Sequence, residues 1–119
     1  MKIIELTGTT DASGDLTVSA SKAYQGYLEK VLVVYVDGAT GADLTLTEEG
    51  PISESILSIT DVGTSSVALY PRLLAQKSDG TNHTVIGKRT LITGKPKLVV
   101  AQGGDTKVFR LLLYLSDIS

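Results

Sequence analysis

The stretch KLVVAQGGDTKVFRLLLYL, residues 97–115, decides the fold class of this chain. Two apolar runs flank AQGGDT, in which Gly103 and Gly104 can adopt the positive φ angles that a tight turn requires. In the second run, two sets of side chains alternate with the period of two of a β-strand. The first set is Phe109, Leu111, Leu113 and Leu115, and the second is Val108, Arg110, Leu112 and Tyr114. The pattern predicts a β-hairpin whose second strand faces the core on one side and has an amphipathic surface on the other.

Two strands are more apolar than a half-exposed sheet requires. Leu112 and Tyr114 leave an apolar patch on the second side of the terminal strand, and residues 31–36 are apolar on both sides. A strand of this kind is covered on both faces within the chain or lies against another subunit. Burial of apolar surface contributes about 25 cal/mol per Å², so burying this patch against another subunit would make a modest favourable contribution to the free energy of association.

Short strand patterns separated by Gly, Asp and Ser turns fill the rest of the chain. They cover residues 2–8, 15–21, 27–37, 42–49, 54–61 and 84–94, and one more strand ends at Tyr70, before Pro71. A short helical turn is the alternative at 54–61. We therefore expect a single all-β domain over residues 1–119, built as an antiparallel β-sandwich or in a jelly-roll-like arrangement of about eight short strands.

The composition fits one domain with an aliphatic core. The 119 residues include no Cys, no Trp and only one Phe, so no disulfide or thiolate metal site is available. The opening MKIIELTGTTD has no apolar segment long enough for a signal peptide, and no run reaches the length of a membrane span. We expect a protein that stays in the cytoplasm or is assembled there into a larger particle, without contact with a membrane.

Charge is divided unevenly between the two halves of the sequence. Residues 1–60 hold nine acidic and three basic residues, a net of −6, whereas residues 61–119 hold eight basic and four acidic residues, a net of +4. Either the halves interleave in the fold and neutralise each other, or complementary faces meet in an oligomer or on a partner. The overall net charge of −2 and the scarcity of aromatic residues argue against nucleic-acid binding.

No motif in the sequence predicts a catalytic, cofactor-binding or metal-binding residue. The single His, His83, lies in a polar loop and is interpreted as a solvated turn residue, and GTNHTVIGKRT fails the spacing of a phosphate-binding loop. Asp37 and Asp43 flank one turn, and Asp11 and Asp15 flank another, without the spacing of an EF-hand. We interpret these carboxylates as structural turn residues and expect no cofactor.

Three segments, YVDGATGADLTLT, ITDVGTSSVALYPR and TGKPKLVVAQGGDTKVFRLLLYL, resemble small all-β virion proteins of tailed bacteriophages. In those sequences a TD strand end, a YPR segment, a polar loop, a VAQGG turn and a final apolar strand follow in this order. The resemblance runs from Tyr35 to Leu115. Outside the first segment, the matching residues are Thr60, Asp61, Tyr70, Pro71, Arg72, Gly94, Leu98, Val99, Val100, Ala101, Gln102, Gly103 and Gly104.

The resemblance implies a capsid cement or decoration protein, a non-enzymatic virion component that binds the outside of the expanded head. It implies the major capsid protein and further copies of the chain as partners, with a trimer as the common assembly. The location is then the capsid surface of the virion, after assembly in the host cytoplasm. From the apolar second faces, the basic half and the polar loop we expect these interface residues: Tyr27, Tyr35, Arg72, His83, Lys88, Arg89, Arg110, Leu112 and Tyr114.

Three other interpretations stay open at the level of sequence. A tail or neck component of the virion would show the same features. A carbohydrate-binding or Ca²⁺-binding β-sandwich module would be supported by tyrosines gathered on one face. An enzyme would need a pocket that contains a pair of carboxylates.

Overall fold

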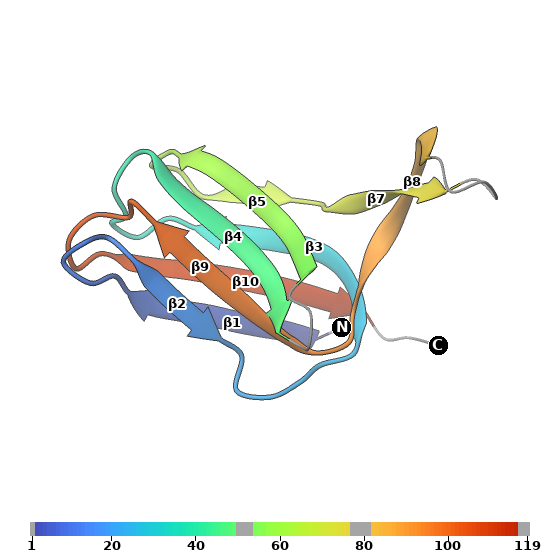
Figure 1. Ribbon diagram of the computed structural model, residues 1–119, viewed down its shortest axis with the longest axis horizontal. Helices are drawn as coiled ribbons and strands as arrows, with labels where there is room; N and C mark the ends of the chain where they lie inside the picture. The colour runs from blue at the N-terminus through green and yellow to red at the C-terminus, as the bar shows by residue number, and fades with distance from the viewer. Residues whose placement is uncertain (1, 50–53, 77–81, 117–119) are drawn as a thin grey trace.

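A computed structural model of the chain describes residues 2–49, 54–76 and 82–116, and for residues 54–55, 61, 72–76 and 82–90 it describes the backbone alone. The described residues form strands joined by turns and contain no helix (Figure 1). The strands are β1 (Lys2–Thr9), β2 (Leu16–Ser19), β3 (Gly26–Val34), β4 (Ala42–Glu49), β5 (Glu54–Val62), β6 (Val67–Leu69), β7 (Arg72–Gln76), β8 (Asn82–Ile92), β9 (Lys95–Ala101) and β10 (Val108–Ser116). The all-β class is confirmed, and residues 54–61 form a strand rather than the alternative helical turn.

The strands form two antiparallel sheets that pack face to face (Figure 1). The large sheet has the order β1-β10-β3-β8-β7, with β6 also paired to β3, and the small sheet has the order β2-β9-β4-β5. The chain passes back and forth between the sheets at its start and at its end, which is the winding of a jelly roll. The predicted sandwich is confirmed. The described strands number ten rather than about eight. A jelly roll has eight strands, and here β6, β7 and β8 together occupy the position of one of them beside β3.

The hairpin predicted over residues 97–115 is wrong, because its two strands belong to opposite sheets. β9 pairs with β2 and β4, whereas β10 pairs with β1 and β3. The connection, residues 102–107, therefore crosses from one sheet to the other. In this arrangement each strand buries its apolar side against the facing sheet, which two neighbouring strands of one sheet cannot do with each other.

The crossing spreads its positive φ angles over alternate residues, whereas a two-residue hairpin turn has them at its central residues alone. Gln102, Gly104 and Thr106 have positive φ angles of 59°, 89° and 54°. Gly103, between them, is buried. A β-carbon at Gly103 would lie 2.7 Å from the Phe109 ring, so the loop lies directly on the core.

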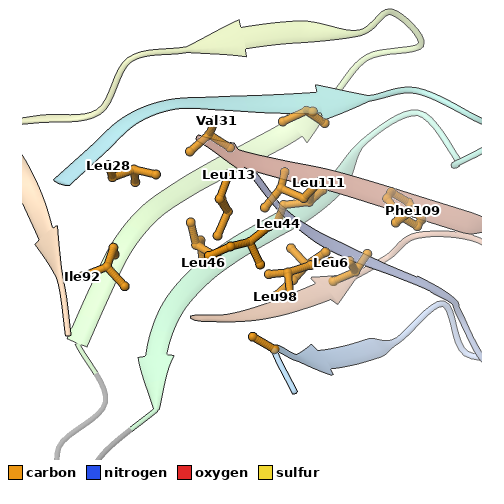
Figure 2. Packing of buried hydrophobic residues seen from close by; sticks show 14 of the residues in the cluster. Leu6, Leu28, Val31, Leu44, Leu46, Ile92, Leu98, Phe109, Leu111 and Leu113 are labelled. Atoms are coloured by element: carbon orange, nitrogen blue, oxygen red, sulfur yellow. The ribbon is translucent and has the colours of Figure 1, made fainter. Parts of the chain in front are cut away.

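The core lies between the inner faces of the two sheets (Figure 2). Of the two alternating sets in β10, the set with Phe109 and Leu111 is buried, as the sequence predicts, and the other set faces outward. From the opposite side the small sheet contributes Leu44, Leu46 and Leu98. β10 lies between β1 and β3 and packs on the small sheet, which explains the high apolar content of its inner side.

A two-stranded arm, residues 72–76 of β7 and 82–89 of β8, extends away from the sandwich (Figure 1). β6 pairs with residues 31–33 of β3, and the end of β8 pairs with residues 26–28 of the same strand. The chain therefore leaves the large sheet after β6 and returns to it at the end of β8. The break between β6 and β7 falls at residues 70–71, where the sequence predicts an edge or bend at the proline.

Candidate interaction surface

The outer side of the large sheet carries an apolar surface that no second layer covers in the described part of the chain (Figure 1). Outward-pointing side chains of β1, β3, β8 and β10 form it, since alternate residues of a strand point to opposite faces. We call it the apolar face, and it consists of Ile3, Tyr27, Leu32, Val34, Leu91, Leu112 and Tyr114. Ile3 and Leu91 are 57% and 44% exposed, and the others are half-buried by their neighbours in the sheet.

Strand register places these residues side by side across the sheet. Leu112 lies opposite Leu32 on one side and opposite Glu5 on the other, and Tyr114 lies opposite Ile3. Directly opposite residues in an antiparallel pair are about 4.5–5.5 Å apart and share one face. The apolar side chains therefore adjoin one another across β1, β10 and β3, with the charged side chains of Glu5, Lys30 and Arg110 on the same face beside them.

Charged groups lie along the apolar face and order its long side chains. The Arg110 Nε donates to the Glu5 Oε2 over 2.5 Å, in an ion pair whose side chains are 43% and 45% exposed. The Lys30 ammonium lies 5.1 Å from the centroid of the Tyr114 ring, within the range of a cation–π contact. Exposed pairs contribute at most about 1 kcal/mol to stability, so the main consequence of these contacts is a defined arrangement of the surface.

The outer side of the small sheet is polar. Its outward positions, which we call the polar face, are Thr17, Ser19, Asp43, Thr45, Thr47, Ser58, Thr60, Lys97, Val99 and Ala101. Thr45 lies at its centre, opposite Val99 in β9 and Ser58 in β5. An antiparallel sheet with one side in water normally has this composition, so the polar face shows what solvent exposure alone selects.

The interface residues predicted from sequence fall in three places. One group shares the outer side of the large sheet and consists of Tyr27, Arg110, Leu112 and Tyr114. Tyr35 follows β3 and lines a shallow hollow at the end of the sandwich. The last group, Arg72, His83, Lys88 and Arg89, lies on β7 and β8, where the side chains are outside the described part of the structure. Their membership in one interface stays a prediction.

The apolar face also contains residues that the sequence did not single out. Leu32 and Val34 lie within residues 31–36, whose two-sided apolar character is the available signal. Ile3 and Leu91 have no comparable signal, because their place on the face follows from the pairing of β1 with β10 and of β8 with β3. Partners so distant in sequence are not visible in a local pattern.

A shallow hollow lies at the end of the sandwich, beside the apolar face. Val34, Tyr35, Val36, Val62 and Phe109 are among its lining residues, and its enclosed space of about 10 Å³ has room for about one water molecule. A site for a small molecule usually encloses at least about 300 Å³. Tyr35 and Val36 are 37% and 48% exposed, so the hollow enlarges the exposed apolar surface rather than forming a ligand pocket.

Two of the carboxylates predicted as turn residues hold turns together, and for these two the structural role is confirmed. The Asp11 Oδ1 accepts hydrogen bonds from the N–H groups of Ser13 (2.9 Å) and Asp15 (3.0 Å), an Asx-type turn. The Asp37 Oδ1 accepts from the N–H of Val108 over 2.7 Å and ties the β3–β4 loop to the start of β10. Among the described residues, no three His, Cys, Asp or Glu side chains gather where they could hold a metal ion.

The tyrosines do not gather into a single platform. Tyr27 and Tyr114 share the apolar face. Tyr24 lies in the β2–β3 loop, where the ammonium groups of Lys2 and Lys22 are 5.5 and 5.4 Å from its ring centroid. Stacking of a sugar needs aromatic rings on one surface, and this arrangement offers a pair of rings rather than all five tyrosines.

Comparison of the chain with protein-family models, with curated proteins and with solved structures finds no match. The described residues contain no helix with the length and apolar character needed to cross a membrane. The surfaces of the sandwich are therefore the basis for assigning a role.

Proposed function

We propose that this chain is a non-enzymatic structural protein of a tailed-phage virion: a capsid cement protein that binds the outside of the expanded head and stabilises it. The observation that carries the proposal is the uncovered apolar face on the outer side of the large sheet. The resemblance of residues 35–115 to small all-β virion proteins supports the same role. The partners are then the major capsid protein and further copies of the chain, and no cofactor takes part.

The apolar face suits a protein that acts by binding to another surface, because binding would bury this face. Contiguous apolar patches larger than a few hundred Å² are uncommon on monomeric soluble proteins and mark interaction sites. Fully burying a Leu or Val side chain contributes roughly 1.5–3 kcal/mol relative to leaving it exposed, and the half-buried Leu32 and Leu112 retain part of that contribution. Apolar residues at the centre with Glu5 and Arg110 beside them match the usual anatomy of an interface, an apolar core and a polar rim.

Binding energy alone is sufficient for cement activity. A protein that binds the expanded lattice and not its precursor stabilises the expanded form by its binding free energy. The effect is summed over the many equivalent positions of a capsid. If neighbouring copies also contact each other, the linked sites hold the lattice more tightly than separate sites do.

The jelly-roll fold supports this role without selecting it. Jelly rolls occur in viral capsid proteins, in lectins and in cupins, so the fold alone does not assign a function. A tail or neck component of the virion would use the same apolar face. The position within the particle therefore has to be tested on heads and on tails.

Binding to purified phage particles tests the proposal. Expanded, DNA-free heads of the encoding phage, stripped of accessory proteins, are mixed with the purified chain and sedimented, and the bound copies are counted. We expect saturable binding and a higher melting temperature of the head. Leu112→Asp, in the apolar face, should weaken binding roughly 100-fold. Thr45→Asp, in the polar face, should leave the affinity within about threefold.

Each other outcome has a defined meaning. An equal loss in both variants would show that added charge, rather than the apolar face, decides binding. Saturable binding to isolated tails and not to heads would place the chain in the tail or neck. Absence of binding to heads and to tails, with folded protein, would reject a virion role.

A further inference from the structure

A bulge in β3 places Lys30 on the outer side of the large sheet, beside the apolar face. The pairing of β3 with β10 skips one residue of β3 between Leu28 and Lys30. Leu28 and Val31 are both fully buried, although residues three apart in a regular strand point to opposite faces. A β-bulge redirects side chains in this way. It buries both apolar residues and leaves the lysine half-buried on the outside.

The Lys30 ammonium is held among the side chains of the apolar face. It lies 5.1 Å from the centroid of the Tyr114 ring, and register places Tyr114 between Lys30 and Ile3. Leu32 is the next outward residue of β3. A partner that covers Leu32 and Tyr114 therefore also covers the ammonium group.

The acidic side chains nearest to Lys30 on this side of the sheet contact other groups. The Glu5 carboxylate pairs with Arg110, and the Glu29 Oε1 accepts a hydrogen bond from the hydroxyl of Ser116 over 3.1 Å. Within the described part of the chain, Lys30 makes the contact with the Tyr114 ring and no ion pair with a carboxylate. Lys30 is therefore a positive charge in the apolar face without an acidic partner there.

An ammonium group in a buried interface needs a partner of opposite charge. Removing it from water without such a partner weakens binding, because the lost hydration is not replaced. Interfaces are accordingly arranged so that the charges of the two sides are complementary. A surface that binds the apolar face is therefore expected to present a carboxylate to Lys30.

A second copy of the chain does not supply this carboxylate readily. Packed through the same face, it brings another Lys30, and its Glu5 and Glu29 are already engaged with Arg110 and with Ser116. A different protein is the better match in charge.

We propose that the apolar face binds an apolar surface of the major capsid protein on which an Asp or Glu carboxylate pairs with Lys30. This inference rests on the proposed function and adds the chemistry of the binding site on the head. The apolar side chains then supply buried area, and the pair of Lys30 with the carboxylate fixes the orientation of the chain on the shell.

Lys30→Met tests this pair, because it removes the charge and keeps most of the length of the side chain. Opposite a carboxylate, it leaves that group buried without a partner, and we expect the affinity for expanded heads to fall about tenfold or more. Opposite an uncharged surface, it removes the cost of desolvating the ammonium, and the affinity would rise. Sedimentation of the purified chain with expanded heads measures the change.

Further variants separate charge from shape and from position. Lys30→Arg keeps the positive charge and should bind within about threefold of the wild type, whereas Lys30→Glu should lose at least as much affinity as Lys30→Met. Lys97→Met is the matched control, because Lys97 is also a half-buried lysine on the outer side of a strand, in the polar face. It should leave the affinity within about threefold. Circular dichroism establishes that each variant is folded, and Lys30→Gln replaces Lys30→Met if the added apolar group causes aggregation.

The outcomes distinguish this inference from the proposed function. Affinity lost in Lys30→Met and kept in Lys30→Arg and Lys97→Met supports the carboxylate. Wild-type binding with unchanged or higher affinity in Lys30→Met overturns it and leaves the proposed function standing, and so does an equal loss in Lys97→Met. Light scattering that shows self-association weakened by Lys30→Met, with head binding unchanged, would assign the face to a second copy and also overturn it. Heads and tails that bind no wild-type chain would reject the proposed function, and this inference with it.

Discussion

The outer faces of the two sheets are built from the same kind of strand, yet they differ in composition. At the centre of the apolar face Leu112 lies opposite Leu32, whereas at the centre of the polar face Thr45 lies opposite Ser58. Both faces lie outside the core, which the inward side chains of both sheets form. The fold therefore requires apolar residues on neither face, and their presence on one of them supports the proposal that this face binds a partner.

The largest expected difference in the free energy of unfolding is between substitutions on the inner and on the outer side of β10. Leu113 is fully buried, and Leu113→Ala should lower the free energy of unfolding by about 2–5 kcal/mol through lost apolar burial and the cavity left behind. Leu112→Ala removes the same atoms from the half-buried outer side and should cost less than about 1.5 kcal/mol. Urea unfolding followed by circular dichroism measures both changes. Equal losses would mean that Leu112 belongs to the core, and the contrast between the faces would lose its basis.

The next largest loss of stability tests the crossing between the sheets. This crossing puts β9 in the sheet that carries the polar face and β10 in the sheet that carries the apolar face. A β-carbon at Gly103 would lie 2.7 Å from the Phe109 ring and 2.9 Å from Val100, so Gly103→Ala should lower the free energy of unfolding by about 1–3 kcal/mol. Gly63→Ala is the matched control, because nothing lies within 4 Å of its β-carbon position. It should change stability by about 0.5 kcal/mol or less. A neutral Gly103→Ala would contradict the packing of the crossing loop on the core.

The smallest expected losses of stability come from removing one polar contact on each face. Glu5→Gln removes the ion pair with Arg110, whose side chains are largely exposed, and should lower the free energy of unfolding by about 0–1 kcal/mol. Ser19→Ala removes the hydrogen bond to Glu49 on the polar face and should cost about 0.5–1.5 kcal/mol. Thermal melting at low salt and at about 1 M NaCl distinguishes them, since screening weakens an exposed ion pair most. A loss of several kcal/mol for Glu5→Gln would show that the fold itself depends on this pair.

The strands and the two sides of β10 are predictable from the sequence, because alternation with period two records which side chains face the core. The partners of those strands are not. The alternation in residues 108–115 is the same for a hairpin in one sheet and for a crossing between two sheets, and Gly103 and Gly104 suit either connection. The positive φ angles at Gln102 and Thr106 have no strong sequence signal, since neither residue is glycine.

The candidate site is predictable in part for the same reason. Leu112 and Tyr114 stand out because one strand is more apolar than a half-exposed strand needs to be. Ile3 joins them only through the pairing of β1 with β10, the first and last strands of the chain. The position of the arm outside the sandwich depends on β6 and β8 pairing with different parts of β3, which no local pattern at residues 67–92 records.

Cysteine labelling of assembled heads tests the central claim most directly, namely that the apolar face is covered when the protein acts. The chain contains no Cys, so one introduced thiol reports one position. Arg110→Cys places it on the outer side of the large sheet and Thr17→Cys on the outer side of the small sheet, and both positions are exposed in the free chain. We predict that head binding protects Arg110→Cys from maleimide and leaves Thr17→Cys reactive. Full labelling of Arg110→Cys on saturated heads, with Thr17→Cys protected or equally labelled, would contradict the claim.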